Sequence, residues 1–282
     1  MPAIINTNIA SLTAQRNNAA SQQSLSTSMQ RLSSGLRVNS AKDDAAGLAI
    51  AERMTAQVRG MNVAMRNAND GISMAQTAEG ALSKVGDSLQ RMRELAIQAR
   101  NGTNNNKDKD SLNKEFVELQ SEIKRVLGGT AFNGSKILGT DAGKTYVFQV
   151  GANVETDDTI DVKFENMATN ADISAVTVNT ASIGSGVDAS AIGSVIQDID
   201  AAIDTINDKR ATFGATQSRF EAVISNLQVA VENQSAAKSR ILDADFAVET
   251  ANMSRAQILQ QASTAMIAQA NQLPQQVLRL LQ

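Results

Sequence analysis

Apolar residues recur along most of this chain with alternating gaps of four and three residues. The longest such stripe covers about 44–100, and a second one begins near Ser190 and runs through Val231. This spacing places the apolar side chains on one face of an α-helix and is typical of helices that pack lengthwise on one another. At about 1.5 Å per residue the first helix would be roughly 85 Å long, several times the length of an average helix. We therefore predict a mainly α fold, a long antiparallel helical bundle or coiled coil.

A shorter stripe follows the first long one. It is preceded by a polar stretch, 101–110, and followed by Gly128 and Gly129, where a helix typically ends. We expect a helix here that is capped by Asp110 or Ser111 and folds back antiparallel on the first long helix.

The period changes to two in the middle of the chain. Apolar and polar residues alternate at 146–150 and again at 160–164, which predicts two β-strands joined by a hairpin connection at 151–158. The residues at 173–178 indicate one more short strand. The predicted fold therefore includes a small β-hairpin element within an otherwise helical chain.

The two ends of the chain share an unusual chemistry. Residues 1–41 contain no Asp or Glu, and Arg279 is the only charged residue from Leu259 to Gln282. A helix on a protein surface normally carries charges on its outer face. We therefore predict that the ends pair as a coiled coil surrounded by other protein, more of it than one copy of the chain supplies. The alternative is that both ends are disordered arms in an isolated monomer.

Each end carries apolar residues at helical spacing. In the tail they recur every seven residues, with others four positions further on, and the N-terminal segment has two shorter stripes. The residues predicted to form the coiled coil are Ile5, Ile9, Leu12, Leu25, Met29, Leu32, Leu36, Leu259, Met266, Ala270, Leu273, Val277 and Leu280. Because proline costs about 3 kcal/mol inside a helix, we also expect a kink or break at Pro274 unless neighbouring subunits hold the helix straight.

These patterns divide the chain into nested segments, in which the two ends enclose the bundle and the bundle encloses the β element. The predicted domains are the N-terminal half of an inner coiled-coil domain plus a joint (1–43), the N-terminal part of a bundle domain (44–140), a short β-rich variable element (141–189), the C-terminal return helix of the bundle (190–242) and the C-terminal half of the coiled-coil domain (243–282).

The composition excludes several classes of function. The chain has no Cys, His or Trp, so it has no thiol nucleophile, no imidazole base and none of the usual zinc or iron ligands. Its net charge of -3 offers nucleic acid no broad basic surface. The acidic groups at 43–44, 157–158 and 198–204 are candidate metal or acid–base clusters. For the group at 198–204 the favoured interpretation is the solvated face of a helix. We predict no catalytic, cofactor-binding or metal-binding residue, and no enzyme activity.

The sequence also lacks the usual targeting signals. No run approaches the ~18 to 20 apolar residues of a membrane span. Residues 1–30 contain neither a positive cluster nor a continuous apolar core. We therefore expect no membrane span and no signal peptide, so the chain is either cytosolic or exported by a route without cleavage.

Several long stretches at both ends are specific enough to identify a family. Near the C-terminus, 252–262 reads Asn-Met-Ser-Arg-Ala-Gln-Ile-Leu-Gln-Gln-Ala. The other stretches are 31–47, 66–73, 79–82, 239–241 and 268–272. In these stretches the chain resembles bacterial flagellin, the subunit of the flagellar filament, and only the middle, about 140–190, shows no such pattern.

The resemblance implies an architecture and a function. In flagellins the terminal segments form a coiled coil that lines a central channel, and an antiparallel bundle with a small β element is the next layer. The apolar residues of the two ends would then mediate polymerisation into a helical filament of identical subunits that serves motility. Because few residues separate the two halves of the bundle, the chain resembles a short flagellin that lacks most of the variable outer domains.

The resemblance also implies partners and a location. Flagellins are exported through the flagellar type III apparatus without signal cleavage, and are secreted into the extracellular flagellum. By resemblance, an export chaperone binds the tail after about Asp243, hook-associated and cap proteins contact the subunits, and host Toll-like receptor 5 recognises the chain. The receptor contacts that the resemblance assigns are Arg91, Leu95 and Glu122, for which subunit packing is the alternative role.

Two other functions stay open. A hook–filament junction (hook-associated) protein shares the terminal architecture. A signalling coiled coil of the chemoreceptor type would also be long and helical, but it would include a membrane span, which the sequence lacks.

Overall fold

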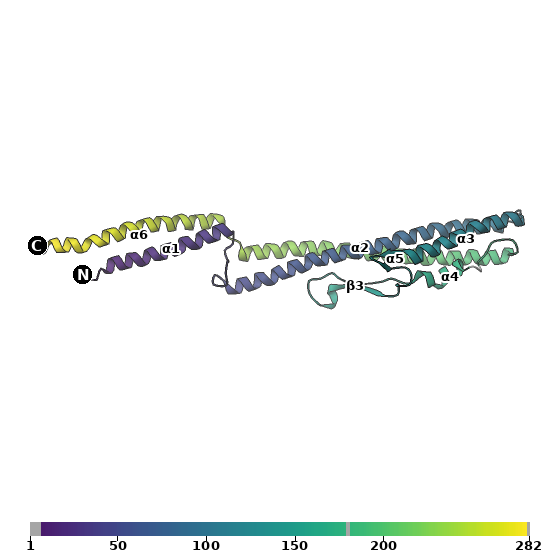
Figure 1. The fold of residues 1–282 in the computed structure, drawn as a ribbon, viewed down its shortest axis with the longest axis horizontal. Helices are drawn as coiled ribbons and strands as arrows, with labels where there is room; N and C mark the ends of the chain where they lie inside the picture. Colours follow the sequence, from purple (N-terminus) through teal and green to yellow (C-terminus); the bar gives the residue numbers. More distant parts are fainter. Residues whose placement is uncertain (1–6, 179–180, 281–282) are drawn as a thin grey trace. The chain divides into compact units, whose positions relative to one another are not determined.

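The computed structural model of this 282-residue chain describes residues 7–178 and 181–280, with side chains as far as Gln272. It is mainly helical, with short antiparallel strand pairs in the middle of the chain (Figure 1), which confirms the predicted fold class. The α-helices are α1 (Ile9–Ser34), α2 (Ala45–Arg100), α3 (Asn106–Gly129), α4 (Ala171–Thr177), α5 (Ala189–Leu242) and α6 (Phe246–Leu280). The strands are β1 (Ala131–Phe132), β2 (Ser135–Lys136), β3 (Thr145–Gln149) and β4 (Thr159–Lys163), and the short 3-10 helices are η1 (Thr156–Asp158) and η2 (Met167–Thr169). None of the helices in the described part of the chain has the apolar length that a membrane crossing requires.

The chain forms two compact units. Residues 1–56 and 232–282 make up unit 1, and residues 57–231 make up unit 2. The division falls inside α2 and α5, so each of these helices contributes to both units, whereas the predicted domain boundaries lie where the helices begin and end.

Unit 2 holds the hydrophobic core of the chain. One face each of α2, α3 and α5 supplies most of it, as their four-three spacing predicts. Residues of the middle of the chain, such as Ile160, Phe164 and Ile173, complete it. Leu89, Phe116 and Phe220 are among its largest fully buried side chains. Gly71 on α2 lies against the ring of Phe220, where a Cβ atom would come within 2.7 Å of the ring. This glycine therefore allows α2 and α5 to approach closely.

Helix α3 begins earlier than the sequence predicts. The expected cap was Asp110 or Ser111, but Asn105 caps the helix. Its side-chain oxygen accepts from the backbone N–H of Asp108 (2.9 Å), and the Asp108 carboxylate accepts from the backbone N–H of Asn105 (3.1 Å). This reciprocal capping box satisfies two backbone N–H donors at once, so the helix begins here rather than at Asp110 or Ser111.

The β element contains the two predicted strands. β3 and β4 pair antiparallel, with Tyr146 opposite Val162 and Phe148 opposite Ile160. A second, smaller hairpin joins β1 to β2 through Asn133 and Gly134, both with positive φ. Asn-Gly is the strongest short hairpin signal in a sequence, but the prediction did not include this hairpin.

The third predicted strand is wrong, because 171–177 forms helix α4. Asn170 caps this helix by accepting from the backbone N–H of Asp172 (3.0 Å). Ile173, Val176 and Thr177 are all buried, and their spacing of three and four fits one helical face. Two of these positions also fit an alternating strand pattern, so a short apolar run does not distinguish the alternatives.

Candidate assembly surface of the terminal helices

The terminal helices α1 and α6 pack side by side as an antiparallel pair (Figure 1). The residues that each helix turns toward the other follow two interleaved seven-residue repeats, and we call them the seam. On α1 the seam consists of Ser11, Ala14, Asn18, Ser21, Leu25, Ser28 and Leu32, all buried or half-buried. On α6 it consists of Glu249, Met253, Ala256, Gln260, Ser263, Ile267 and Ala270, again all buried or half-buried.

Small and polar side chains dominate this seam. Ser11 and Ser28 are the buried residues of α1, and Ala256 is among those of α6. Small side chains allow two helices to approach closely. They also remove little apolar surface from water, so at roughly 25 cal/mol per Å² the seam alone stabilises the pair only weakly.

An ion pair crosses the seam at one end. Arg31 on α1 donates from an NH1 nitrogen to Oε1 of Glu249 on α6, 3.0 Å away, and the Glu249 side chain is only 8% exposed. Arg31 Nε and Glu249 Oε2 are also buried but have no hydrogen-bond partner among the residues that the structure describes. A buried carboxylate with an unused oxygen leaves room for a donor from outside the chain.

An amide bridges the other end of the seam. Asn8 caps α1 through its side-chain oxygen, which accepts from the backbone N–H of Ser11 (3.0 Å). Its Nδ2 donates to the backbone carbonyl of Ala270 on α6 (2.8 Å). Pro274, four residues further on, has no N–H to donate to that carbonyl, so Asn8 supplies the missing bond. Helix α6 continues past Pro274 to Leu280, so the chain shows no break there. A kink, the other expected outcome, stays a prediction.

The chain segments next to the two helices are joined by backbone hydrogen bonds. Leu36 and Asp243 form an isolated antiparallel bridge. The N–H of Arg37 donates to Leu242 O (2.6 Å), and the N–H of Ala244 donates to Gly35 O (2.9 Å). These bonds hold the end of α1 beside the start of α6.

The coiled-coil residues predicted from sequence fall into three groups. Leu25, Leu32 and Ala270 lie in the seam, and Leu36 lies at the bridge. Ile5 and the side chains of Leu273, Val277 and Leu280 lie outside the described part of the structure. The remaining residues are exposed and lie outside the seam: Ile9 (62%), Leu12 (56%), Met29 (53%), Leu259 (49%) and Met266 (62%).

The sequence pattern of α6 therefore predicts its apolar stripe but not the seam. The seam repeat Glu249, Ala256, Ser263 and Ala270 has the same seven-residue period as the apolar stripe. Its small residues indicate that two helices approach closely. They do not stand out in a pattern that is defined by large apolar residues.

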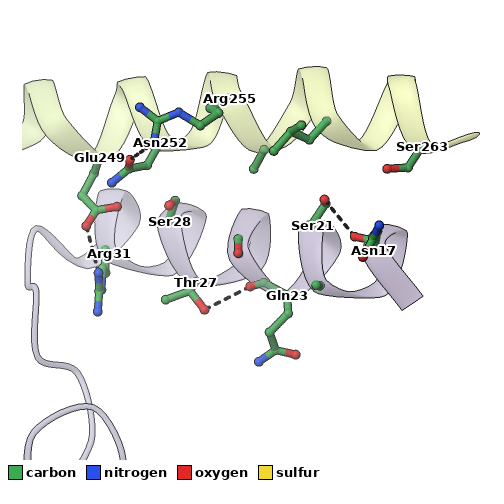
Figure 2. Close-up of a pocket in the computed structure, with 14 residues that line it drawn as sticks. Asn17, Ser21, Gln23, Thr27, Ser28, Arg31, Glu249, Asn252, Arg255 and Ser263 are labelled. Atoms are coloured by element: carbon green, nitrogen blue, oxygen red, sulfur yellow. Dashed lines mark hydrogen bonds and ion pairs between the residues drawn. The ribbon is translucent and has the colours of Figure 1, made fainter. Parts of the chain in front are cut away.

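A groove of about 720 Å³ runs between α1 and α6. Figure 2 shows its lining, in which Asn17, Ser21 and Ser28 come from α1, and Asn252 and Arg255 from α6. Leu259 lines it as well, and Arg31 and Glu249 lie at one end. The groove is thus mostly polar, with an apolar contribution from the exposed stripe of α6.

The residues assigned to receptor contacts by resemblance lie in unit 2, on α2 and α3. Arg91 is half-exposed and donates to Glu94 (2.9 Å) and to Glu115 on α3 (2.8 Å). These bonds raise the pKa of Arg91, and the bond to Glu115 has the largest effect. Glu122 pairs instead with Arg125 on its own helix (2.6 Å). Leu95 is 1% exposed in the core. The carboxylate on α3 that pairs with Arg91 is therefore Glu115. The sequence does not reveal how α3 is aligned along α2.

The acidic groups of the sequence are not gathered into a metal site. Among the residues that the structure describes, no three acidic side chains converge to hold a metal ion. Asp200 pairs with Arg93 of α2, Oδ1 to Nε 2.6 Å apart, while Asp198 and Asp204 are exposed. The 198–204 group therefore follows the solvated-face interpretation, with one carboxylate neutralised by an arginine.

Comparison with known proteins decides the family. The family description "Bacterial flagellin N-terminal helical region" matches residues 5–142, and "Bacterial flagellin C-terminal helical region" matches residues 196–281. The chain is also 47% identical over 279 residues to a flagellin of Halalkalibacterium halodurans, with 99% of each chain covered. The chain belongs to the bacterial flagellins.

Other flagellins agree over the whole length. The chain is 44% identical over 322 residues to a flagellin of Xenorhabdus nematophila, covering 100% of both chains. It is 43% identical over 307 residues to a flagellin of Bacillus subtilis, covering 98% of this chain and 99% of the relative. The family comprises structural subunits of the flagellar filament, which supports the prediction that this flagellin is not an enzyme.

Proposed function

We propose that this flagellin polymerises into the flagellar filament by burying the outward faces of α1 and α6 among other copies of itself. One observation carries the proposal: in its described part, unit 1 exposes large apolar side chains and has almost no core of its own. The buried apolar residues in that part are Val38, Ala51, Ala256 and Ala270. Its exposed large apolar residues are Ile9, Leu12, Met29, Ile50, Phe246, Val248, Ile258, Leu259 and Met266.

The energetics support burial between copies. Completing the burial of a half-exposed Leu, Ile or Met contributes roughly 1 kcal/mol or more. Several such residues per subunit supply the driving force that the small-residue seam lacks. Contacts between unlike surfaces that do not close into a ring extend into an open helical filament.

Truncation tests the proposal at the level of the whole tail. A chain that ends at Leu259 should keep unit 2 folded, as measured by circular dichroism, but should not form filaments under electron microscopy after seeding. Filaments of the truncated chain would contradict the role of the ends. A hook–filament junction protein would not extend into long filaments by itself, so filament length in the full chain separates that alternative.

Point variants test the outward faces themselves. We expect Leu12→Gln with Leu259→Gln to raise the critical concentration for polymerisation roughly tenfold to a hundredfold, from the apolar area lost. The control is Val147→Gln on β3 in unit 2, which is 62% exposed, similar to Leu12. If both variants polymerise like the wild type in a light-scattering assay, the outward faces are not the assembly surface.

Export and its partners form a second part of the proposal. We propose that the chain leaves the cell through the flagellar type III apparatus without signal cleavage and functions in the extracellular filament, beside hook-associated and cap proteins. An export chaperone covers the segment after Asp243 before assembly. The exposed Phe246, Val248 and Ile258 support this, since free apolar side chains need a cover in the monomer. Calorimetric titration of chaperone into the full chain and into a chain ending at Asp243 tests it, and equal affinity would contradict it.

Receptor recognition is a third part, centred on Arg91. We propose that host Toll-like receptor 5 contacts the charged surface of α2 and α3 around Arg91, with Glu122 at its edge. Leu95 contributes through its packing beneath this surface, because its side chain is buried. In a reporter-cell assay Arg91→Ala should lower signalling, while Arg219→Ala, at an exposed arginine of α5, should not. Unchanged signalling by Arg91→Ala would remove the assignment.

A further inference from the structure

We propose that Met29 and Met266 are oxidation sites that determine whether a subunit can enter the filament. The inference rests on the proposed polymerisation through α1 and α6. Among the methionines that the structure describes, these two have exposed side chains, 53% and 62%. Met61, Met74, Met92 and Met167 are at most 8% exposed, and Met54, Met65 and Met253 are half-buried.

The two methionines lie at opposite ends of the helix pair. Met29 is two residues from Arg31, which pairs with Glu249. Met266 is one helical turn from Ala270, whose carbonyl accepts from Asn8. Each is therefore beside one of the polar contacts that close the seam, on a face that the seam leaves uncovered.

The chain directs sulfur oxidation to these positions. It contains no cysteine, so the thioethers of methionine are its only sulfur groups that an oxidant can attack. Oxidation of a thioether depends on access to the sulfur, and the buried methionines of unit 2 are shielded. A two-electron oxidant outside the cell or in the cytoplasm therefore meets Met29 and Met266 first.

The reaction is an oxygen transfer. Hypochlorous acid, an oxidant of the hypohalous class, delivers its oxygen to the thioether sulfur and leaves as chloride and a proton. Sulfur loses two electrons and chlorine gains them, giving the sulfoxide. The sulfoxide turns a flexible apolar side chain into a polar one, and methionine sulfoxide reductases reverse the change.

The consequence follows from where the side chains go on assembly. A sulfoxide at a surface that must be buried between subunits carries an oxygen that loses its hydrogen bonds to water. Oxidised monomers should therefore polymerise poorly, with a critical concentration raised roughly tenfold or more. Subunits already inside a filament are protected, because the same burial covers the sulfur.

The experiment uses the full chain as a monomer and as a filament. Both forms receive limiting hypochlorous acid, and peptide mass spectrometry measures the sulfoxide at each methionine. We expect Met29 and Met266 to be oxidised much faster than Met74 and Met92 in the monomer, and to be protected in the filament. Equal rates at all four positions in the monomer, or no protection in the filament, would overturn the proposal.

Assembly is then measured on the oxidised monomer. Seeded polymerisation should fall with sulfoxide content and recover after treatment with methionine sulfoxide reductases. The double variant Met29→Leu with Met266→Leu keeps the apolar character, so the oxidant should lower its polymerisation little relative to its own untreated sample. The control Met54→Leu with Met65→Leu, at half-buried methionines of α2, should lose as much polymerisation to the oxidant as the wild type does, each relative to its own untreated sample. A Met29/Met266 double variant that loses assembly to the oxidant as the wild type does would refute the proposal.

The outcomes separate this proposal from the function on which it rests. If untreated wild-type protein does not polymerise, the proposed function fails. The other outcome is that untreated protein polymerises and protein with sulfoxides at Met29 and Met266 polymerises equally well. In that case the proposed function stands, and the proposal that oxidation controls assembly fails.

Discussion

The side-chain amide of Asn8 donates a hydrogen bond to the backbone carbonyl of Ala270, 2.8 Å away. That carbonyl is the one that Pro274 leaves without a partner inside α6, because proline has no N–H. The oxygen of the same amide caps α1 by accepting from the Ser11 N–H (3.0 Å). One side chain therefore stabilises the start of α1 and the proline-containing region of α6 together.

Replacing Asn8 should loosen both helices. Asn8→Ala removes the cap of α1, which costs about 1 kcal/mol, and leaves Ala270 O without a bond. We expect faster amide hydrogen exchange near both sites, measured by mass spectrometry on the monomer. Asn17→Ala, at an exposed asparagine of the same helix, is the control. Adding Pro274→Ala restores a helical N–H donor for Ala270 O, so it should rescue the exchange rate in α6 but not in α1.

Breaking the Arg31–Glu249 pair should separate the terminal helices. Arg31→Ala leaves a carboxylate that is 8% exposed without its cation. We expect a loss of about 2 to 3 kcal/mol in the pairing of α1 with α6, below the full range for a buried pair because Arg31 is itself partly exposed. Limited proteolysis measures the opening. Arg16→Ala, at an exposed position of α1, should leave the cleavage rate unchanged, and equal rates for both variants would contradict the assigned role of the pair.

Two glycines of α2 should respond to alanine in opposite directions. Gly71→Ala places a Cβ atom 2.7 Å from the Phe220 ring, and such overpacking costs roughly 1 to 3 kcal/mol. Gly80→Ala meets nothing within 4 Å and should stabilise the helix by up to about 1 kcal/mol. Urea unfolding of the full chain, followed by the helical signal, measures both. A stabilised Gly71→Ala would show that α2 and α5 do not approach closely at this point.

The loop between α1 and α2 should weaken in acid through Asp43. Hydrogen bonds from the backbone N–H groups of Ser40 (2.9 Å) and Asn39 (3.1 Å), and from the Ser40 hydroxyl (3.1 Å), hold the pKa of Asp43 below its ordinary value of 3.8. Because the folded pKa is the lower one, the stabilisation is complete above 3.8 and is lost as the pH falls through the folded value.

Nuclear magnetic resonance titration of the Asp43 carboxyl carbon measures this pKa directly. Asp43→Ala removes these hydrogen bonds, so it should destabilise the loop at neutral pH. The difference in stability between the variant and the wild type should shrink below about pH 4. Ser40→Ala removes one of the three bonds and should move the Asp43 pKa upward. A titration midpoint of Asp43 at or above 3.8 in the wild type would contradict the hydrogen-bond assignment.

The long helices were predictable because their periodic patterns are long. The predicted helix from about 44 to 100 is α2, Ala45–Arg100, and the return helix predicted for 190–242 is α5, Ala189–Leu242. Over many turns the four-three period averages out local exceptions such as Gly71 and Gly80. The errors lie in short elements, where few residues carry the signal. At 173–178 the same apolar residues fit a strand or a helical turn, and only the packing of α4 in the core chooses the helix.

Charge pairs between α2 and α3 show the same limit. Arg91 and its partner Glu115 lie on different helices, and their pairing depends on how α3 is aligned along α2. Each helix pattern is periodic, so a shift by one turn preserves the apolar faces but changes every charge pair. The partner of Glu122 is likewise set by the structure, which pairs it with Arg125 on its own helix.

The terminal helices show most clearly how the two sources of information divide. Their length, their pairing and their shortage of charge can be read from the residues alone, because helical period and composition are local properties. The face used for that pairing cannot. In α6 the rows through Ala256 and through Leu259 both repeat every seven residues, so either could form the seam. The structure selects the row of small side chains, since these let α1 and α6 approach closely, and it leaves Leu259 and Met266 exposed beside the seam.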